Sequence, residues 1–146
     1  QDAAIVEDEI NRLRTILETD IKKSRQHFLK LSIPNTYQQL LIKGIKEDYS
    51  MGFPRQLGFR AGTCTSFQWF DLSTNQQALL TIYPLVAMDV TLKNYLKLTP
   101  EQAIEELKGI KQTIKNVNGT FITLFHQSNL NGDWYNWRKV YESVFE

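Results

Sequence analysis

This chain of 146 residues has only one cysteine, no long apolar run and no excess of one charge. The single cysteine, Cys64, excludes an internal disulfide and supplies no metal cluster of its own. No apolar segment is long enough for a signal peptide or a membrane span. The 17 basic residues nearly balance the 16 acidic ones, leaving a net charge of +1. We therefore expect neither nucleic acid nor a membrane as the main partner, and the cellular location stays open.

Hydrophobic residues make up 42% of the chain, which is enough to bury a core, and we expect residues 1–146 to form a single domain. The first residue is Gln1 rather than Met, which indicates a chain that is processed or is cut from a longer protein. No internal repeat or low-complexity segment is visible in the sequence.

The most informative stretch runs from Thr120 to Ser128. Its first six residues are β-branched or aromatic apart from Leu124, which is typical of a strand buried on both faces of a parallel sheet. His126 ends this predicted strand, and α/β folds place ligands and catalysis at the carboxyl ends of strands. His126 is therefore our leading functional candidate. The alternative is a histidine whose ring is simply hydrogen-bonded at the end of a strand.

Three more polar side chains lie in or beside predicted strands. Asp89 interrupts the apolar run 85–90, where an unpaired carboxylate is costly, so it needs a partner unless it only caps a local turn. Arg25 and His27 occupy alternate positions of the short segment 21–28, and alternation predicts that both point to the same face. Arg25 could equally be an interior arginine paired with a carboxylate.

The remaining pattern alternates helices with strands and predicts an α/β fold. The clearest local signal is a capping box, in which Thr99 caps a helix, Pro100 takes its first position and Gln102 completes the box. Turn residues at 73–76 predict a hairpin between two apolar runs. Helical spacing of apolar residues predicts helices over 3–18, 32–42, 99–118 and 133–145.

Two further residues are candidates for function. Arg60 lies in the glycine-rich loop 52–62, a setting for close approach to a ligand, although a salt bridge to Asp48 or Asp71 would brace the loop equally well. Trp69, on the predicted hairpin, is the better exposed candidate for stacking against a sugar ring. Trp134 and Trp137 share a helical stripe more typical of a core, and Cys64 is more typical of a buried thiol than of a nucleophile.

In their order and spacing, five motifs resemble the carboxyl-terminal half of a polysaccharide deacetylase of the NodB-homology group, with the greatest likeness to divergent members from Bacteroidetes-type bacteria. The resemblance covers nearly the whole chain. The motifs are Ser24-Arg25-Gln26-His27-Phe28, Asp48-Tyr49-Ser50, Gly58-Phe59-Arg60-Ala61-Gly62-Thr63-Cys64, Met88-Asp89-Val90-Thr91-Leu92 and Phe121-Ile122-Thr123-Leu124-Phe125-His126.

This resemblance implies a metal-dependent enzyme that hydrolyses N- or O-acetyl groups of a carbohydrate. His126 would be the acid that protonates the leaving amine, and Asp89 would orient or tune it. Arg25 stands where the family has an arginine that steadies the catalytic base, and Arg60 is a second candidate for that role. The family usually has proline two residues after the arginine, whereas this chain has His27, which we expect to be structural or to contact the substrate.

The family's paired-aspartate and His-x-x-x-His metal motifs do not occur in this chain, and we expect them upstream of Gln1. We accordingly expect a divalent metal, zinc before others, in the full-length enzyme and none in this chain, which should be inactive alone. The implied fold is a partial distorted (β/α) barrel lacking its amino-terminal strands. An open strand edge would favour a homo-oligomer. The alternative function is a non-catalytic carbohydrate-binding or accessory domain that keeps the fold.

Overall fold

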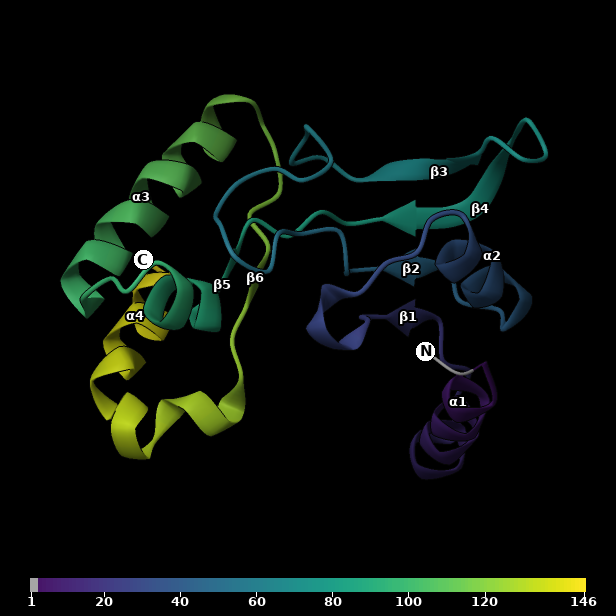
Figure 1. Ribbon diagram of the computed structural model, residues 1–146, viewed down its shortest axis with the longest axis horizontal. Helices are drawn as coiled ribbons and strands as arrows, with labels where there is room; N and C mark the ends of the chain where they lie inside the picture. Colours follow the sequence, from purple (N-terminus) through teal and green to yellow (C-terminus); the bar gives the residue numbers. More distant parts are fainter. Residues whose placement is uncertain (1–2) are drawn as a thin grey trace. The chain divides into compact units, whose positions relative to one another are not determined.

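The computed structural model describes residues 3–146, which combine helices and strands in two compact units (Figure 1). The first unit comprises the described residues of Gln1–Ser50 together with Phe67–Ile82. The second comprises Met51–Ser66 and Tyr83–Glu146. The chain therefore has an α/β composition, as the sequence predicts. Among residues 3–146, no helix combines the length and apolarity that crossing a membrane requires.

The first unit is built on a four-stranded sheet in the order β1-β2-β4-β3. Its strands are β1 (Lys23–Ser24), β2 (Glu47–Asp48), β3 (Phe67–Asp71) and β4 (Gln76–Ile82). β1, β2 and β4 run parallel, with Ser24 beside Asp48 and Asp48 beside Ile82. β3 and β4 are antiparallel, which confirms the predicted hairpin. Because parallel strands end at a common edge, the residues that follow β1 and β2 lie close together.

Two helices accompany this sheet. α1 (Ala3–Leu17) buries Ile10, but Leu13 and Leu17 of its expected apolar stripe are 43% and 57% exposed. α2 (Asn35–Ile42) contacts β4 and buries Tyr37 and Leu40. It ends at Ile42, the predicted boundary, and Gly44 follows with a φ of 78°, which glycine adopts at little cost.

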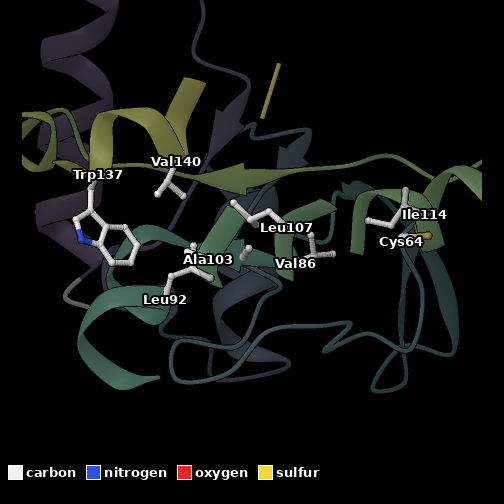
Figure 2. Packing of buried hydrophobic residues seen from close by; sticks show 9 residues of the cluster. Cys64, Val86, Leu92, Ala103, Leu107, Ile114, Trp137 and Val140 are labelled. Carbon is white, nitrogen blue, oxygen red and sulfur yellow. The ribbon is translucent and has the colours of Figure 1, made fainter. Parts of the chain in front are cut away.

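The second unit packs helices around a two-stranded parallel sheet of β5 (Ala87–Met88) and β6 (Thr123–Leu124). Its other elements are the π-helix η2 (Thr91–Tyr95), α3 (Pro100–Asn116), the 3₁₀ segments η3 (Gln127–Leu130) and η4 (Gly132–Trp137), and α4 (Arg138–Ser143). Nine buried residues of this unit form one cluster, most of which Figure 2 labels: Cys64, Val86, Ala87, Leu92, Ala103, Leu107, Ile114, Trp137 and Val140. The predicted burial of Cys64 and Trp137 is confirmed.

The predicted start of α3 is confirmed, whereas the predicted length of the closing helix is not. α3 begins with the predicted capping box, in which the Thr99 side chain accepts from the Gln102 backbone and the Gln102 side chain accepts from the Thr99 backbone. The closing helix predicted over 133–145 is instead divided into η4 and α4. Asn131 caps the start of η4 by accepting from Gly132 N–H at 2.8 Å.

The prediction of a strand buried on both faces over 120–126 is wrong. β6 contains only Thr123 and Leu124, and the side chains from Phe121 to His126 are all half-buried. The physical reason is that β6 pairs with β5 alone within the described part of the chain, so it has the surroundings of an edge strand.

The path into β6 depends on a close contact between Gly119 and Cys64. A Cβ atom at Gly119 would lie 2.2 Å from Cys64 Sγ, and Thr120 N–H donates to the Cys64 carbonyl at 3.0 Å. The thiol therefore occupies the space that any larger residue at position 119 would need. This contact sets where the chain turns from α3 toward His126.

We predict that Gly119→Ala lowers the free energy of unfolding by about 1–3 kcal/mol, because the added methyl overpacks the core against Cys64. Gly109→Ala is the matched control: a Cβ atom there would have nothing within 4 Å, and the change should raise stability by about 0.5–1 kcal/mol in a helix. Urea unfolding of both variants measures the difference. Adding Cys64→Ala to Gly119→Ala should recover part of the loss, and a purely additive double variant would contradict the contact.

Candidate acid–base site

The centre of the candidate site is the buried carboxylate of Asp89, which accepts four hydrogen bonds. Oδ1 accepts from Val90 N–H at 2.7 Å and from His126 Nδ1 at 2.8 Å. Oδ2 accepts from His126 N–H and from Asn129 Nδ2, both at 2.9 Å. Both oxygens are thus satisfied, as a buried carboxylate requires. The sequence predicted that Asp89 needs a partner, and the structure provides His126 and Asn129.

The two strands of the second unit bring this pair together. β5 and β6 are parallel, with Ala87 beside Thr123 and Met88 beside Leu124. Asp89 follows β5 directly, and His126 lies two residues beyond the end of β6. Since parallel strands end at the same edge, the two side chains meet there although they are far apart in sequence.

The geometry determines which imidazole nitrogen is available. An ionised carboxylate can only accept hydrogen bonds, so His126 Nδ1 carries the proton that is shared with Asp89 Oδ1. Nε2 is then the ring nitrogen that can exchange a proton with a ligand or with solvent. The His126 side chain is 40% exposed, whereas that of Asp89 is 2% exposed. A buried carboxylate that orients a half-exposed imidazole is an arrangement suited to acid–base chemistry.

Asn129 is a member of this site that the sequence analysis missed. It lies in η3, and its side-chain amide holds Oδ2 of Asp89, the oxygen that does not contact the imidazole ring. The one signal in the sequence is its position three residues after His126 in a polar turn. That signal is faint, because asparagine is common in turns for purely local reasons.

Arg60 belongs to the same unit but makes a different kind of contact. Its guanidinium NH1 donates to the Gly52 carbonyl at 3.1 Å, which braces the loop between β2 and β3. Arg60 is half-buried. This contact to a backbone carbonyl agrees with the loop-bracing interpretation of Arg60.

A second polar cluster lies in the first unit, where β1 and β2 end. Asp48 and Ser50 are fully buried, and the Asp48 carboxylate accepts from Ser50 N–H at 2.9 Å and from Ser50 Oγ at 2.8 Å. Ser50 Oγ in turn accepts from Gln26 N–H at 2.8 Å. Arg25 Nε donates to the Tyr49 carbonyl at 3.3 Å, and its guanidinium lies 5.8 Å from the centre of the Tyr49 ring.

The surroundings of Asp48 make its carboxyl a weaker acid than an exposed one. Burial raises the pKa of the Asp48 carboxyl above its ordinary value. Hydrogen bonds from Ser50 and Tyr37 and the positive charge of Arg25 act in the opposite direction without cancelling the effect of burial on this pKa. From the sequence, Asp48 was expected as a partner for Arg60 and as part of the motif Asp48-Tyr49-Ser50. Asp48 and Ser50 are two positions apart, and this spacing in an extended segment predicts that both side chains point to the same face.

The two residues predicted to contact substrate have different outcomes. His27 does not share a strand face with Arg25, because β1 ends at Ser24 and His27 begins the short 3₁₀ turn η1 (His27–Leu29). The His27 ring is exposed and stacks on Phe28 with centroids 4.2 Å apart. The prediction that Trp69 is exposed is wrong: it is 6% exposed and packs edge-to-face on Tyr37, at 5.4 Å. On the short hairpin, its side chain points to the covered face of the sheet, whereas Phe70 points outward.

The described residues do not fit a metal site. Within residues 3–146, no group of three or more His, Cys, Asp or Glu side chains is placed to hold a metal ion. Both oxygens of Asp89 are already occupied by hydrogen bonds, and His126 alone supplies one donor atom. The chemistry that these two side chains can perform on their own is proton transfer.

Searches of protein-family models, of curated proteins and of solved structures find no match to this chain.

We predict that Asn129→Ala lowers the free energy of unfolding by about 1–3 kcal/mol, because it removes one donor from the buried Asp89 carboxylate. Asn136→Ala is the matched control, since Asn136 is exposed in η4 and its loss should change stability by less than about 0.5 kcal/mol. Urea unfolding measures both. Equal stabilities of the two variants would show that Asn129 does not support the carboxylate.

The raised pKa of Asp48 predicts a pH dependence with a defined sign. A carboxyl whose pKa is raised on folding contributes stability while protonated, and that contribution is lost as the pH rises from its ordinary value of 3.8 through the folded value. The stability of the wild type relative to Asp48→Asn should therefore fall with rising pH over this range. Urea unfolding between about pH 3 and pH 7 measures it.

Asp71→Asn provides the control of opposite sign. Hydrogen bonds from Gln38 and Ser73 lower the pKa of the Asp71 carboxyl, so its contribution is present above 3.8 and is lost at lower pH. The wild type should gain stability relative to this variant as the pH rises toward 3.8. The same slope for both variants would contradict the account of Asp48.

Proposed function

We propose that this chain supplies the proton-donating histidine of a carbohydrate deacetylase of the polysaccharide deacetylase type. The observation that carries the proposal is the contact of 2.8 Å between Nδ1 of the half-exposed His126 and the buried carboxylate of Asp89. The resemblance of five ordered motifs to that family supports it, because two of those motifs contain these residues.

The proposed chemistry is hydrolysis of an acetyl group on a sugar. Water adds to the acetyl carbonyl, the bond from the carbonyl carbon to nitrogen breaks, and acetate and a free amine are formed. The amine leaves readily only if its nitrogen gains a proton as that bond breaks. Protonated His126 would donate this proton from Nε2, while the Asp89 carboxylate stabilises the charged ring and keeps its orientation. An O-acetyl group would be cleaved likewise, with an alcohol leaving.

The other roles in this proposal rest on the resemblance. Arg25 or Arg60 would steady the base that activates water, and His27 would contact the substrate. A divalent ion, zinc in our expectation, would be held by Asp and His residues that the resemblance places upstream of Gln1. The chain alone would then be inactive.

The proposed architecture is part of a distorted (β/α) barrel. Parallel pairing of β1, β2 and β4, and of β5 with β6, supports this proposal, because barrels of this kind are built from parallel strands. β1 and β3 are the edge strands of the larger sheet. Self-association through such an edge into a homo-oligomer, and an acetylated carbohydrate as the substrate, are further parts of the proposal.

The proposal is tested by assaying acetate release from acetylated chitooligosaccharides, using the longest native polypeptide that contains residues 1–146 and added zinc. We expect His126→Ala to reduce kcat by about 10²- to 10⁴-fold, the range for loss of a general acid. Gln127→Ala, at the exposed neighbouring position, should retain full activity. Unchanged kcat in His126→Ala would exclude the assigned role.

A polypeptide that binds the saccharide without releasing acetate would instead favour the alternative function. In that case the chain would be a carbohydrate-binding or accessory domain. His126→Ala would then have no catalytic effect to measure, and its binding would equal that of the wild type.

A further inference from the structure

A groove of about 490 Å³ lies in the first unit, between residues of α1, η1 and α2. This volume is in the usual range for sites that bind small molecules, roughly 300–1,000 Å³. The groove uses neither Asp89 nor His126, so its function is a separate question from the proposed acid–base chemistry.

One edge of the groove carries an exposed aromatic ring on an unusual backbone. Phe28 is 70% exposed and has a φ of 58°, and the next residue, Leu29, has a φ of 52°. Left-handed conformations are unfavourable for residues other than glycine, and two in succession are rare. Leu29 is buried and its N–H donates to the Gln26 carbonyl at 2.9 Å, which holds the turn in place. Such strain is typical of functional positions.

The ring of Phe28 is also held in a defined orientation. It stacks on the His27 ring with an interplanar angle of 26°, and Lys30 Nζ lies 5.8 Å from its centre. All three residues line the groove. The turn therefore presents a flat aromatic surface at the edge of a hollow, which is the surface that the C–H face of a pyranose ring packs against.

The lining of the groove favours a ligand with many hydroxyl or amide groups. It includes side-chain amides and hydroxyls that both donate and accept hydrogen bonds, namely Gln26, Ser32, Asn35, Thr36 and Gln39. Its most buried cation, Lys43, is paired with Glu7, so this positive charge is neutralised. A sugar ring satisfies this mixture better than a purely apolar molecule or a multivalent anion does.

We propose that this groove binds a pyranose ring of an oligosaccharide, with Phe28 stacked on the sugar and the amides of Asn35 and Gln39 contacting its polar groups. Its lining contains neither Asp89 nor His126. The proposed site holds whether the chain is part of a deacetylase or not, and it makes Phe28 a specificity-determining residue of the first unit.

The test is titration of the ¹⁵N-labelled chain with N-acetylated chitotetraose, followed by NMR of the side-chain amide signals of Asn35 and Gln39. We expect saturable shifts of these signals with a dissociation constant of about 1 mM. Phe28→Gly should weaken binding at least tenfold without loss of stability, because glycine suits the φ of position 28. Phe70→Ala, which removes a 46%-exposed ring from β3, should bind like the wild type.

The proposal is overturned if the two amide signals do not move at about 10 mM sugar, or if Phe28→Gly binds as well as the wild type. Repeating the titration with His126→Ala separates this site from the proposed enzyme. Unchanged binding in that variant supports sugar binding in the groove, whatever the acetate assay shows. Loss of binding in His126→Ala would show that the sugar binds at His126 instead of in the groove.

Discussion

The buried carboxylate of Asp89 is the constraint on which the second unit depends. Placing an ionised carboxylate in a protein interior costs several kcal/mol unless hydrogen bonds replace the lost water. Here two backbone N–H groups and two side chains supply those bonds, and three of the four donors come from the segment that follows β6. The chain beyond Leu124 must therefore pass directly beside Asp89, and this requirement holds the His126 ring in place.

The same constraint explains why the imidazole is both oriented and accessible. The half-buried strand β6 carries the chain to the sheet edge, where the His126 ring contacts Asp89 through Nδ1 and its side chain stays 40% exposed. Gly119 and Cys64 determine how the chain enters this strand. Packing in the core of the second unit and hydrogen bonding at its edge thus act together on a single side chain.

The features that the sequence predicted well are those with a local cause. The capping box at Thr99, the hairpin turn and the end of α2 at Ile42, just before Gly44, each depend on a few neighbouring residues, whose side chains or backbone freedom decide the structure. The need of Asp89 for a partner was also visible, because a carboxylate in an apolar run is costly wherever the chain folds.

Features that depend on distant parts of the chain were predicted less well. The composition of residues 120–125 indicates a buried strand, but burial also needs neighbours on both sides, and β6 has one partner among the described strands. Trp69 was expected to be exposed, yet its face of the hairpin is covered by Tyr37. Asn129 and the left-handed turn at Phe28 have no distinctive pattern, because each follows from tertiary contacts rather than from composition.

The most direct test of the central claim is the tautomer of His126, read from the ¹⁵N chemical shifts of its ring in a long-range ¹H–¹⁵N correlation spectrum of the neutral form. The account predicts a proton on Nδ1, shared with Asp89, and an unprotonated Nε2. Asp89→Ala should shift the population toward protonated Nε2. A wild-type ring protonated on Nε2 would contradict the orientation assigned to His126 and with it the proposed acid–base role.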